Sequence, residues 1–118
     1  MGVILLKQTT GTSTSGSSGN NPAYTESEKL ILEMEMEFKT SNLENYKELQ
    51  YDIEGYLSNV SIWYDNTKAL KIFNKDFNYN NGYLESTLLK RISDSALLLR
   101  TFEYTNGSLT SVTTSASI

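Results

Sequence analysis

One pattern of basic, apolar and aromatic residues occurs three times after residue 45. In each copy a basic residue, an apolar residue and a tyrosine stand at alternate positions, and a glycine and then a leucine follow. The copies are Lys47, Leu49, Tyr51, Gly55 and Leu57; Lys75, Phe77, Tyr79, Gly82 and Leu84; and Arg100, Phe102, Tyr104, Gly107 and Leu109. Because alternate residues of a strand share a face, each copy predicts a strand with these three side chains on one side.

The glycines mark the turns of three predicted hairpins. Asn81-Gly82 and Asn106-Gly107 are typical of type I′ turns, in which both central residues take positive φ. Turn residues at 65–67 and 94–95 would join each hairpin to the next. We therefore expect a mainly β fold, a six-stranded antiparallel meander of three hairpin repeats that forms a domain over residues 46–118. The expected strands are 46–54, 56–64, 68–80, 83–93, 96–105 and 108–116.

The strands differ in their apolar content. The residues expected to form the core are Leu57, Trp63, Phe73, Phe77, Leu84, Leu88, Ile92, Leu97, Leu99 and Phe102. The final strand, from Leu109 to Ile118, is mostly Ser and Thr, which pair well in β-structure without requiring burial. This composition predicts an edge strand or a strand that extends onto a neighbour.

A short amphipathic helix is expected before the meander, over residues 24–45. Thr25 and Glu28 match a capping box, and the apolar residues 30, 31, 34 and 38 fall on one helical face. Residues 30–39 also alternate as a strand would, but Leu, Glu, Met and Lys favour the helix. A break is expected at 41–45, where a second cap at Ser41 is possible.

The N-terminal region divides into an apolar anchor at 1–8 and a flexible Thr/Ser/Gly tether at 9–23. Val3, Ile4, Leu5 and Leu6 favour a short strand, and no apolar residue follows between Thr9 and Asn21. A tethered β-prone segment could add a strand to the sheet edge of another subunit, so these four residues are the predicted partner-binding site. The alternative is a disordered terminus in which they have no role.

Composition removes most chemistry from consideration. The chain has no Cys and no His, and its formal net charge of −4 argues against a nucleic-acid partner. It has no apolar run long enough to span a membrane, and no metal or cofactor motif. Glu33, Glu35 and Glu37 are expected to form a solvated face. We expect no cofactor, no metal site and no enzymatic activity.

Aromatic residues are the remaining candidates for a binding site. Trp63, Tyr64 and Tyr83 lie near Asn and Asp residues and could stack on sugar rings. Tyrosine also packs naturally on a half-buried sheet with its hydroxyl in water, and this structural interpretation is the one we favour.

The repeat resembles the YD-type repeat, whose signature is Tyr-Asp-x-x-Gly-x-Leu. Tyr51-Asp52 with Gly55 and Leu57 matches it, whereas Asn80 and Thr105 replace the aspartate in the later copies. The apolar N-terminal segment, polar tether, helix and polar meander together look like small virion structural proteins of tailed bacteriophages. The resemblance implies a structural subunit of a virion (head decoration, fibre, neck or tail), assembled in the host cytoplasm and held to other virion proteins by its N-terminal strand. Separately, a homo-oligomer, with a trimer favoured, would protect the two open edges of the meander. The alternative function is a small β-sheet module that recognises a glycan or a host surface.

Overall fold

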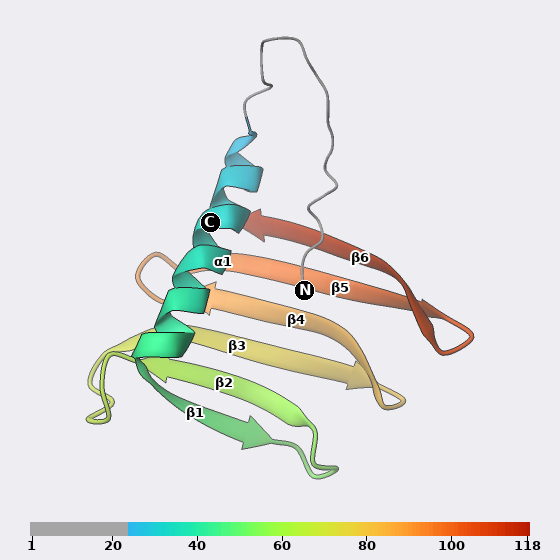
Figure 1. Cartoon of the computed structure of the whole chain (residues 1–118), viewed down its shortest axis with the longest axis horizontal. Coiled ribbons are helices and arrows are strands. Elements are labelled where there is room, and N and C mark those ends of the chain that lie inside the picture. Colours follow the sequence, from blue (N-terminus) through green and yellow to red (C-terminus); the bar gives the residue numbers. More distant parts are fainter. Residues whose placement is uncertain (1–23) are drawn as a thin grey trace.

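A computed structural model describes residues 24–118, which form one helix and a six-stranded antiparallel sheet (Figure 1). The strands follow one another across the sheet in chain order, so the predicted meander is confirmed. The elements are α1 (Glu26–Glu44), β1 (Tyr46–Tyr51), β2 (Leu57–Trp63), β3 (Lys71–Asn80), β4 (Tyr83–Arg91), β5 (Ala96–Thr105) and β6 (Ser108–Ser117).

The predicted helix is present, and its N-terminus is capped as expected. The Glu28 backbone N–H donates to Thr25 Oγ1 at 3.1 Å, and the Thr25 N–H donates to Glu28 Oε1 at 2.8 Å. The break expected at 41–45 was wrong, because α1 continues to Glu44 and Asn45 caps its C-terminus. Ser and Asn disfavour a helix by only about 0.5 kcal/mol each, which the adjoining helical turns can offset.

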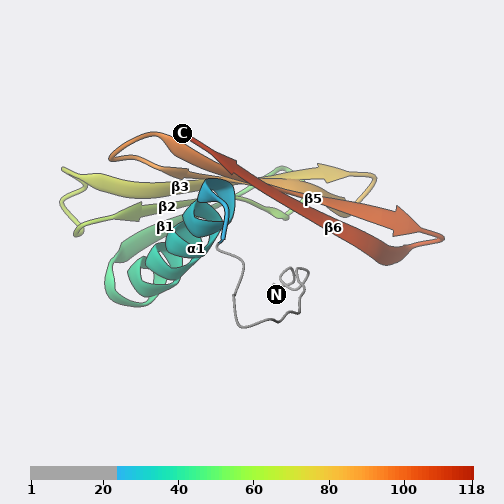
Figure 2. The same cartoon turned by 90° about the horizontal axis from the view of Figure 1, so that it is seen from above.

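Helix α1 lies across one face of the sheet, as the view from above shows (Figure 2). The core lies between the two layers, where Phe38 of α1 meets Phe73 of β3 edge to face, with ring centroids 5.6 Å apart. The buried apolar residues are Met34, Val60, Ile62, Phe73, Leu89, Ala96 and Leu98. No second layer of described residues covers the opposite face (Figure 2).

The core differs from the expected one in β4 and β5. Leu89 and Leu98 are paired across these strands and buried beneath the helix, whereas Leu88 and Leu99 form the neighbouring pair on the opposite face. Both strands contain consecutive leucines, so alternation could not decide which of them faces inward. Of the ten residues expected in the core, only Phe73 is fully buried.

The hairpin turns have the predicted backbone conformation. Asn81 and Gly82 have φ of 54° and 84°, and Asn106 and Gly107 have φ of 52° and 81°, as a type I′ turn requires. In the first repeat the Asp52 carboxylate organises a longer turn by accepting the backbone N–H groups of residues 54 and 56. All three turns lie at the end of the sheet farther from α1 (Figure 1).

Candidate functional site

The tyrosines of the repeats form the contacts between successive hairpins. Tyr79 and Tyr104 lie on the same side of the sheet as α1. Each stands four residues after a basic residue, Lys75 or Arg100, that reaches the helix, and residues an even number apart in a strand share a face. The predicted sharing of a face within each of these two copies is therefore confirmed. We call the contact of one hairpin with the next the repeat contact.

The first repeat contact joins the hairpin β1–β2 to the hairpin β3–β4. The Tyr79 hydroxyl donates to the backbone carbonyl of Leu57 at 2.8 Å, and the Tyr79 ring stacks on Tyr56 at 5.0 Å between centroids. The Tyr56 hydroxyl oxygen lies 3.3 Å from where a Cβ of residue 82 would stand, so Gly82 gives the ring room as well as providing the turn. Burial raises the pKa of the Tyr79 hydroxyl, which remains a donor at neutral pH.

The second repeat contact has the same parts, one hairpin further along the sheet. The Tyr104 hydroxyl donates to the Leu84 carbonyl at 2.7 Å, and the rings of Tyr104 and Tyr83 lie 4.9 Å apart. The Tyr83 hydroxyl oxygen stands 3.2 Å from the Cβ position of residue 107. The leucine of one repeat and the tyrosine just before it therefore hold the tyrosine and the glycine of the next repeat.

Each phenol bridges a place where the backbone ladder has ended. The β2–β3 ladder stops at Asn59 and Asp76, before it reaches Leu57. The β4–β5 ladder stops at Ser86 and Thr101, before it reaches Leu84. Because neighbouring hairpins separate toward their turns, the tyrosine side chain supplies the hydrogen bond that the backbone no longer makes.

The series is unfinished at both edges of the sheet. Tyr51, the first tyrosine of the pattern, is 59% exposed, and its hydroxyl has no hydrogen bond within residues 24–118. At the other edge Leu109 is 52% exposed, and Ser108 stands where the other repeats have Tyr56 and Tyr83.

Charged groups attach α1 to the sheet. Arg91 donates through two nitrogens to Asp94, at 3.0 and 2.7 Å, and through a third to Glu37 at 2.9 Å and to Glu33. Asp94 has its pKa lowered to about 2, chiefly by the hydrogen bonds from Arg91 and then by the Ala96 backbone N–H. Arg91 itself has its pKa raised, mainly by Asp94.

The glutamates of α1 are therefore more than a solvated face, which corrects the expectation. Glu35 binds Arg100 of β5, as Glu33 and Glu37 bind Arg91. Nearby, burial lowers the pKa of the Lys75 ammonium, which lies over the Phe38 ring at 5.1 Å. The charges of the pattern thus serve the packing of the helix.

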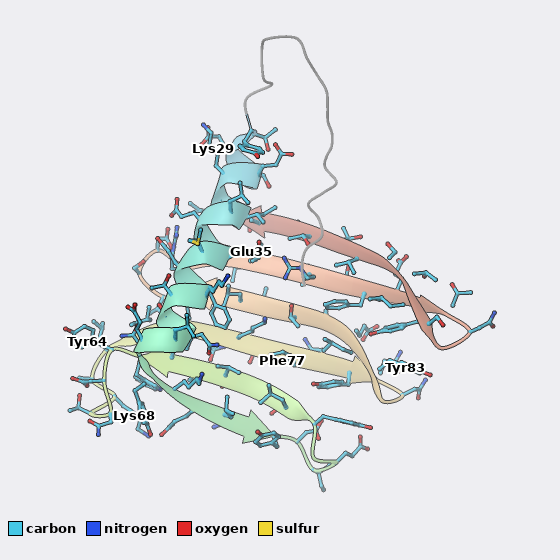
Figure 3. The ribbon with its side chains drawn as sticks, viewed as in Figure 1. Lys29, Glu35, Tyr64, Lys68, Phe77 and Tyr83 are labelled. Carbon is cyan, nitrogen blue, oxygen red and sulfur yellow. The ribbon has the colours of Figure 1, made fainter. Side chains whose placement is uncertain are left out.

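The three residues predicted for glycan binding do not form one site. Tyr64 follows β2 near the C-terminal end of α1, whereas Tyr83 lies at the far end of the sheet, beside the β3–β4 turn (Figure 3). The Trp63 indole N–H is buried without a partner among the described residues, and Lys71 covers its ring at 4.9 Å. Of the three, only Tyr83 lies beside another aromatic ring.

Two open clefts near the turns lie beside the repeat contacts. One, of about 800 Å³, is lined by Tyr56, Phe77 and Tyr79 together with the Asp52 turn. The other, of about 260 Å³, is lined by Tyr83, Phe102 and Tyr104 with Asn80, Asn81 and Glu85. Aromatic rings beside carboxylate and amide groups are the chemistry that was expected at Trp63. The Gly-Tyr pairs at 55–56 and 82–83, each of which follows a tyrosine of the pattern, could have indicated these positions.

Other predictions are limited by what the structure describes. Val3, Ile4, Leu5 and Leu6 lie outside residues 24–118. Within that range no three metal-ligating side chains come together, and no helix is long and apolar enough to cross a membrane. No protein-family model, curated protein or solved structure matches the chain.

Proposed function

We propose that this protein is a non-enzymatic structural subunit of a larger assembly, joined to its neighbours by strand addition at the sheet edge β6. The observation that carries the proposal is the character of that edge. It is a ten-residue strand, Ser108–Ser117, that contains no charged residue and no proline and that pairs only with β5 among the described strands.

Such an edge is unusual for a protein that works alone. An edge strand presents a row of unpaired N–H and C=O groups, and isolated proteins block it with charges, proline, bulges or a short strand. In β6 the one irregularity lies at its start, opposite Tyr104, and the strand is otherwise long and regular. The edge therefore suits a protein in which a partner strand completes the sheet.

A test replaces one exposed residue of this edge. Thr113→Lys puts a charge on β6, and Thr105→Lys puts the same charge at an exposed position of the inner strand β5. Sedimentation measures the native mass of each full chain over a wide range of concentration. We expect the mass to rise with concentration for the unchanged chain and for the β5 variant, and to stay near that of a monomer for the β6 variant. A chain that stays monomeric at every concentration would contradict the proposal.

The narrower assignment, a bacteriophage virion with Val3–Leu6 as its anchor, remains a prediction from the sequence. Deleting residues 1–21 leaves the Thr25 cap of α1 in place, so the deleted chain should keep its melting temperature. If the anchor prediction is right, that chain no longer enters the assembly. Unchanged incorporation would remove the anchor from the proposal.

The second candidate function, glycan recognition, is favoured by the two aromatic clefts near the turns. Tyr83→Ala opens the smaller cleft, whereas Trp63→Ala changes a ring that Lys71 already covers. On a glycan array we expect the Tyr83 variant to lose any binding that the Trp63 variant keeps. No binding of the unchanged chain to any sugar would end this candidate.

A further inference from the structure

We propose that β1 of one copy pairs with β6 of a second copy, so that the meander continues from chain to chain. Tyr51 then takes the place that Tyr79 and Tyr104 hold within a chain. This inference rests on the proposed function, because it names the partner strand and the register that β6 would accept. The occupant is a second copy because this chain carries both halves of an unfinished repeat contact.

The two edges are complementary in direction and in side chains. β1 and β6 lie at opposite edges of an antiparallel meander and run in opposite directions, so β1 of a second copy placed beside β6 continues the antiparallel order (Figure 1). The exposed Tyr51 supplies the missing phenol, and the exposed Leu109 supplies the missing acceptor carbonyl. The contact between copies would therefore use the same two groups as each internal contact, a tyrosine hydroxyl and a leucine carbonyl.

The internal contacts give the register. In the first contact, the last ladder pair is Asn59 with Asp76. Asn59 stands two residues after Leu57, and Asp76 stands three residues before Tyr79. The second contact repeats this rule with Ser86, two residues after its leucine, and Thr101, three residues before its tyrosine.

Applied to the unfinished edges, the rule pairs Ser111, two residues after Leu109, with Glu48, three residues before Tyr51. Two further pairs then fit before the first residue of β1 is reached: Val112 with Lys47, and Thr113 with Tyr46.

The faces of the two strands agree with this register. Glu48 pairs with Ser61 and Ser111 pairs with Glu103, and both pairs lie on the face that α1 leaves open. A slip of one residue would place the side chains of one strand on the opposite face. The deduced register avoids this, because it pairs open-face residues of β1 with open-face residues of β6.

The contact should be weaker than the internal ones. It has three ladder pairs, whereas the β2–β3 ladder has five, and Ser108 offers Tyr51 no ring to stack on. A contact that joins two different edges is also heterologous, so it produces a closed ring or an open filament. The trimer expected from the sequence would require three such contacts to close.

Disulfide trapping tests the register, because the chain has no cysteine of its own. Full-length Glu48→Cys is mixed with full-length Ser111→Cys under mild oxidation, and the linked peptides are identified by mass spectrometry. The matched control pairs Glu48→Cys with Thr113→Cys, which is displaced by two residues on the same face and is too distant for a good disulfide. We expect the 48–111 link to dominate, and Tyr51→Phe to reduce its yield about fivefold, as loss of about 1 kcal/mol implies.

Two results would overturn the inference while leaving the assembly proposal in place. A 48–113 link as abundant as the 48–111 link would contradict the register. A link of Ser111→Cys with itself, in a chain whose mass still rises with concentration, would show that two β6 edges pair. If the unmodified chain is monomeric at all concentrations and no link forms, the proposed function fails as well.

Discussion

The phenol-to-carbonyl bond of the repeat contact predicts a specific pattern of stability losses. Tyr79→Phe removes one hydroxyl and leaves the ring stacked on Tyr56, so the change isolates the bond to the Leu57 carbonyl. A hydrogen bond of this kind contributes about 1 kcal/mol net, and the loss should lower the melting temperature by about 5 °C. Tyr104→Phe makes the same change one hairpin along and should cost a similar amount.

The chain provides its own control for this experiment. Tyr51 has the same place in the pattern, but its hydroxyl makes no hydrogen bond within residues 24–118, so Tyr51→Phe should leave the monomer's stability unchanged. Urea unfolding of the three single variants, and of the double variant at Tyr79 and Tyr104, measures the four changes in the free energy of unfolding. Dilute protein is used, because assembly would stabilise the folded chain by mass action. The double variant should lose about 2 kcal/mol, since the two contacts share no residue.

Two outcomes would refute this reasoning. If Tyr51→Phe costs as much as Tyr79→Phe, the loss comes from something other than the phenol-to-carbonyl bond. If neither internal variant loses stability, the hydroxyl gains no more from the carbonyl than from water, and the repeat contact depends on ring packing alone. The second result would also remove the fivefold effect expected of Tyr51 in copy-to-copy pairing.

Three further predictions concern the turns and the helix contact. Gly82→Ala should cost more than Gly55→Ala, whose loss should be about 1 kcal/mol for a positive φ alone, because only at residue 82 does a Cβ press on the Tyr56 hydroxyl; urea unfolding compares them. The pKa of Asp94 is lower in the folded chain than in the unfolded chain, so its stabilisation is complete above about pH 4 and is lost as the pH falls toward about 2. Asp94→Asn should therefore reduce the dependence of the free energy of unfolding on pH in that range, as urea unfolding at several pH values would measure. Arg91→Ala should cost about 2 to 3 kcal/mol in thermal unfolding, less than for a fully buried pair because its partner carboxylates reach water.

The meander could be predicted because its signals are local. Asn-Gly turns and alternating residues determine neighbouring strands, and sequence neighbours become sheet neighbours when the connections are short. The side that the leucines face is a tertiary outcome, decided by which residues of β4 and β5 lie beneath α1. No local pattern distinguishes Leu88 from Leu89 in a strand where both are leucine.

The candidate site was only half predictable, for a similar reason. The tyrosine pattern is visible in the sequence, and the packing of tyrosine on the sheet that the sequence favours is seen at Tyr104. The acceptor of its hydroxyl, the Leu84 carbonyl, is a backbone group in the preceding repeat, and no side-chain motif marks it. Trp63 was a candidate because it is an aromatic residue near Asn and Asp, yet the clefts are lined mainly by residues of the repeats.

The last repeat departs from the pattern in a way that distinguishes a terminal cap from an assembly surface. Repeat proteins usually end in a capping unit with a polar outer face, and the Ser and Thr residues of β6 at first suggest such a cap. A cap that prevents strand addition commonly carries charge or proline, since Ser and Thr are themselves good strand formers. β6 has neither, although charged residues are present in β3, β4 and β5. Replacement of tyrosine by Ser108 removes the stacking ring but keeps the backbone carbonyl of Leu109 as an acceptor. An edge that keeps its hydrogen-bonding groups and loses some ring packing is suited to a reversible contact rather than to a permanent one.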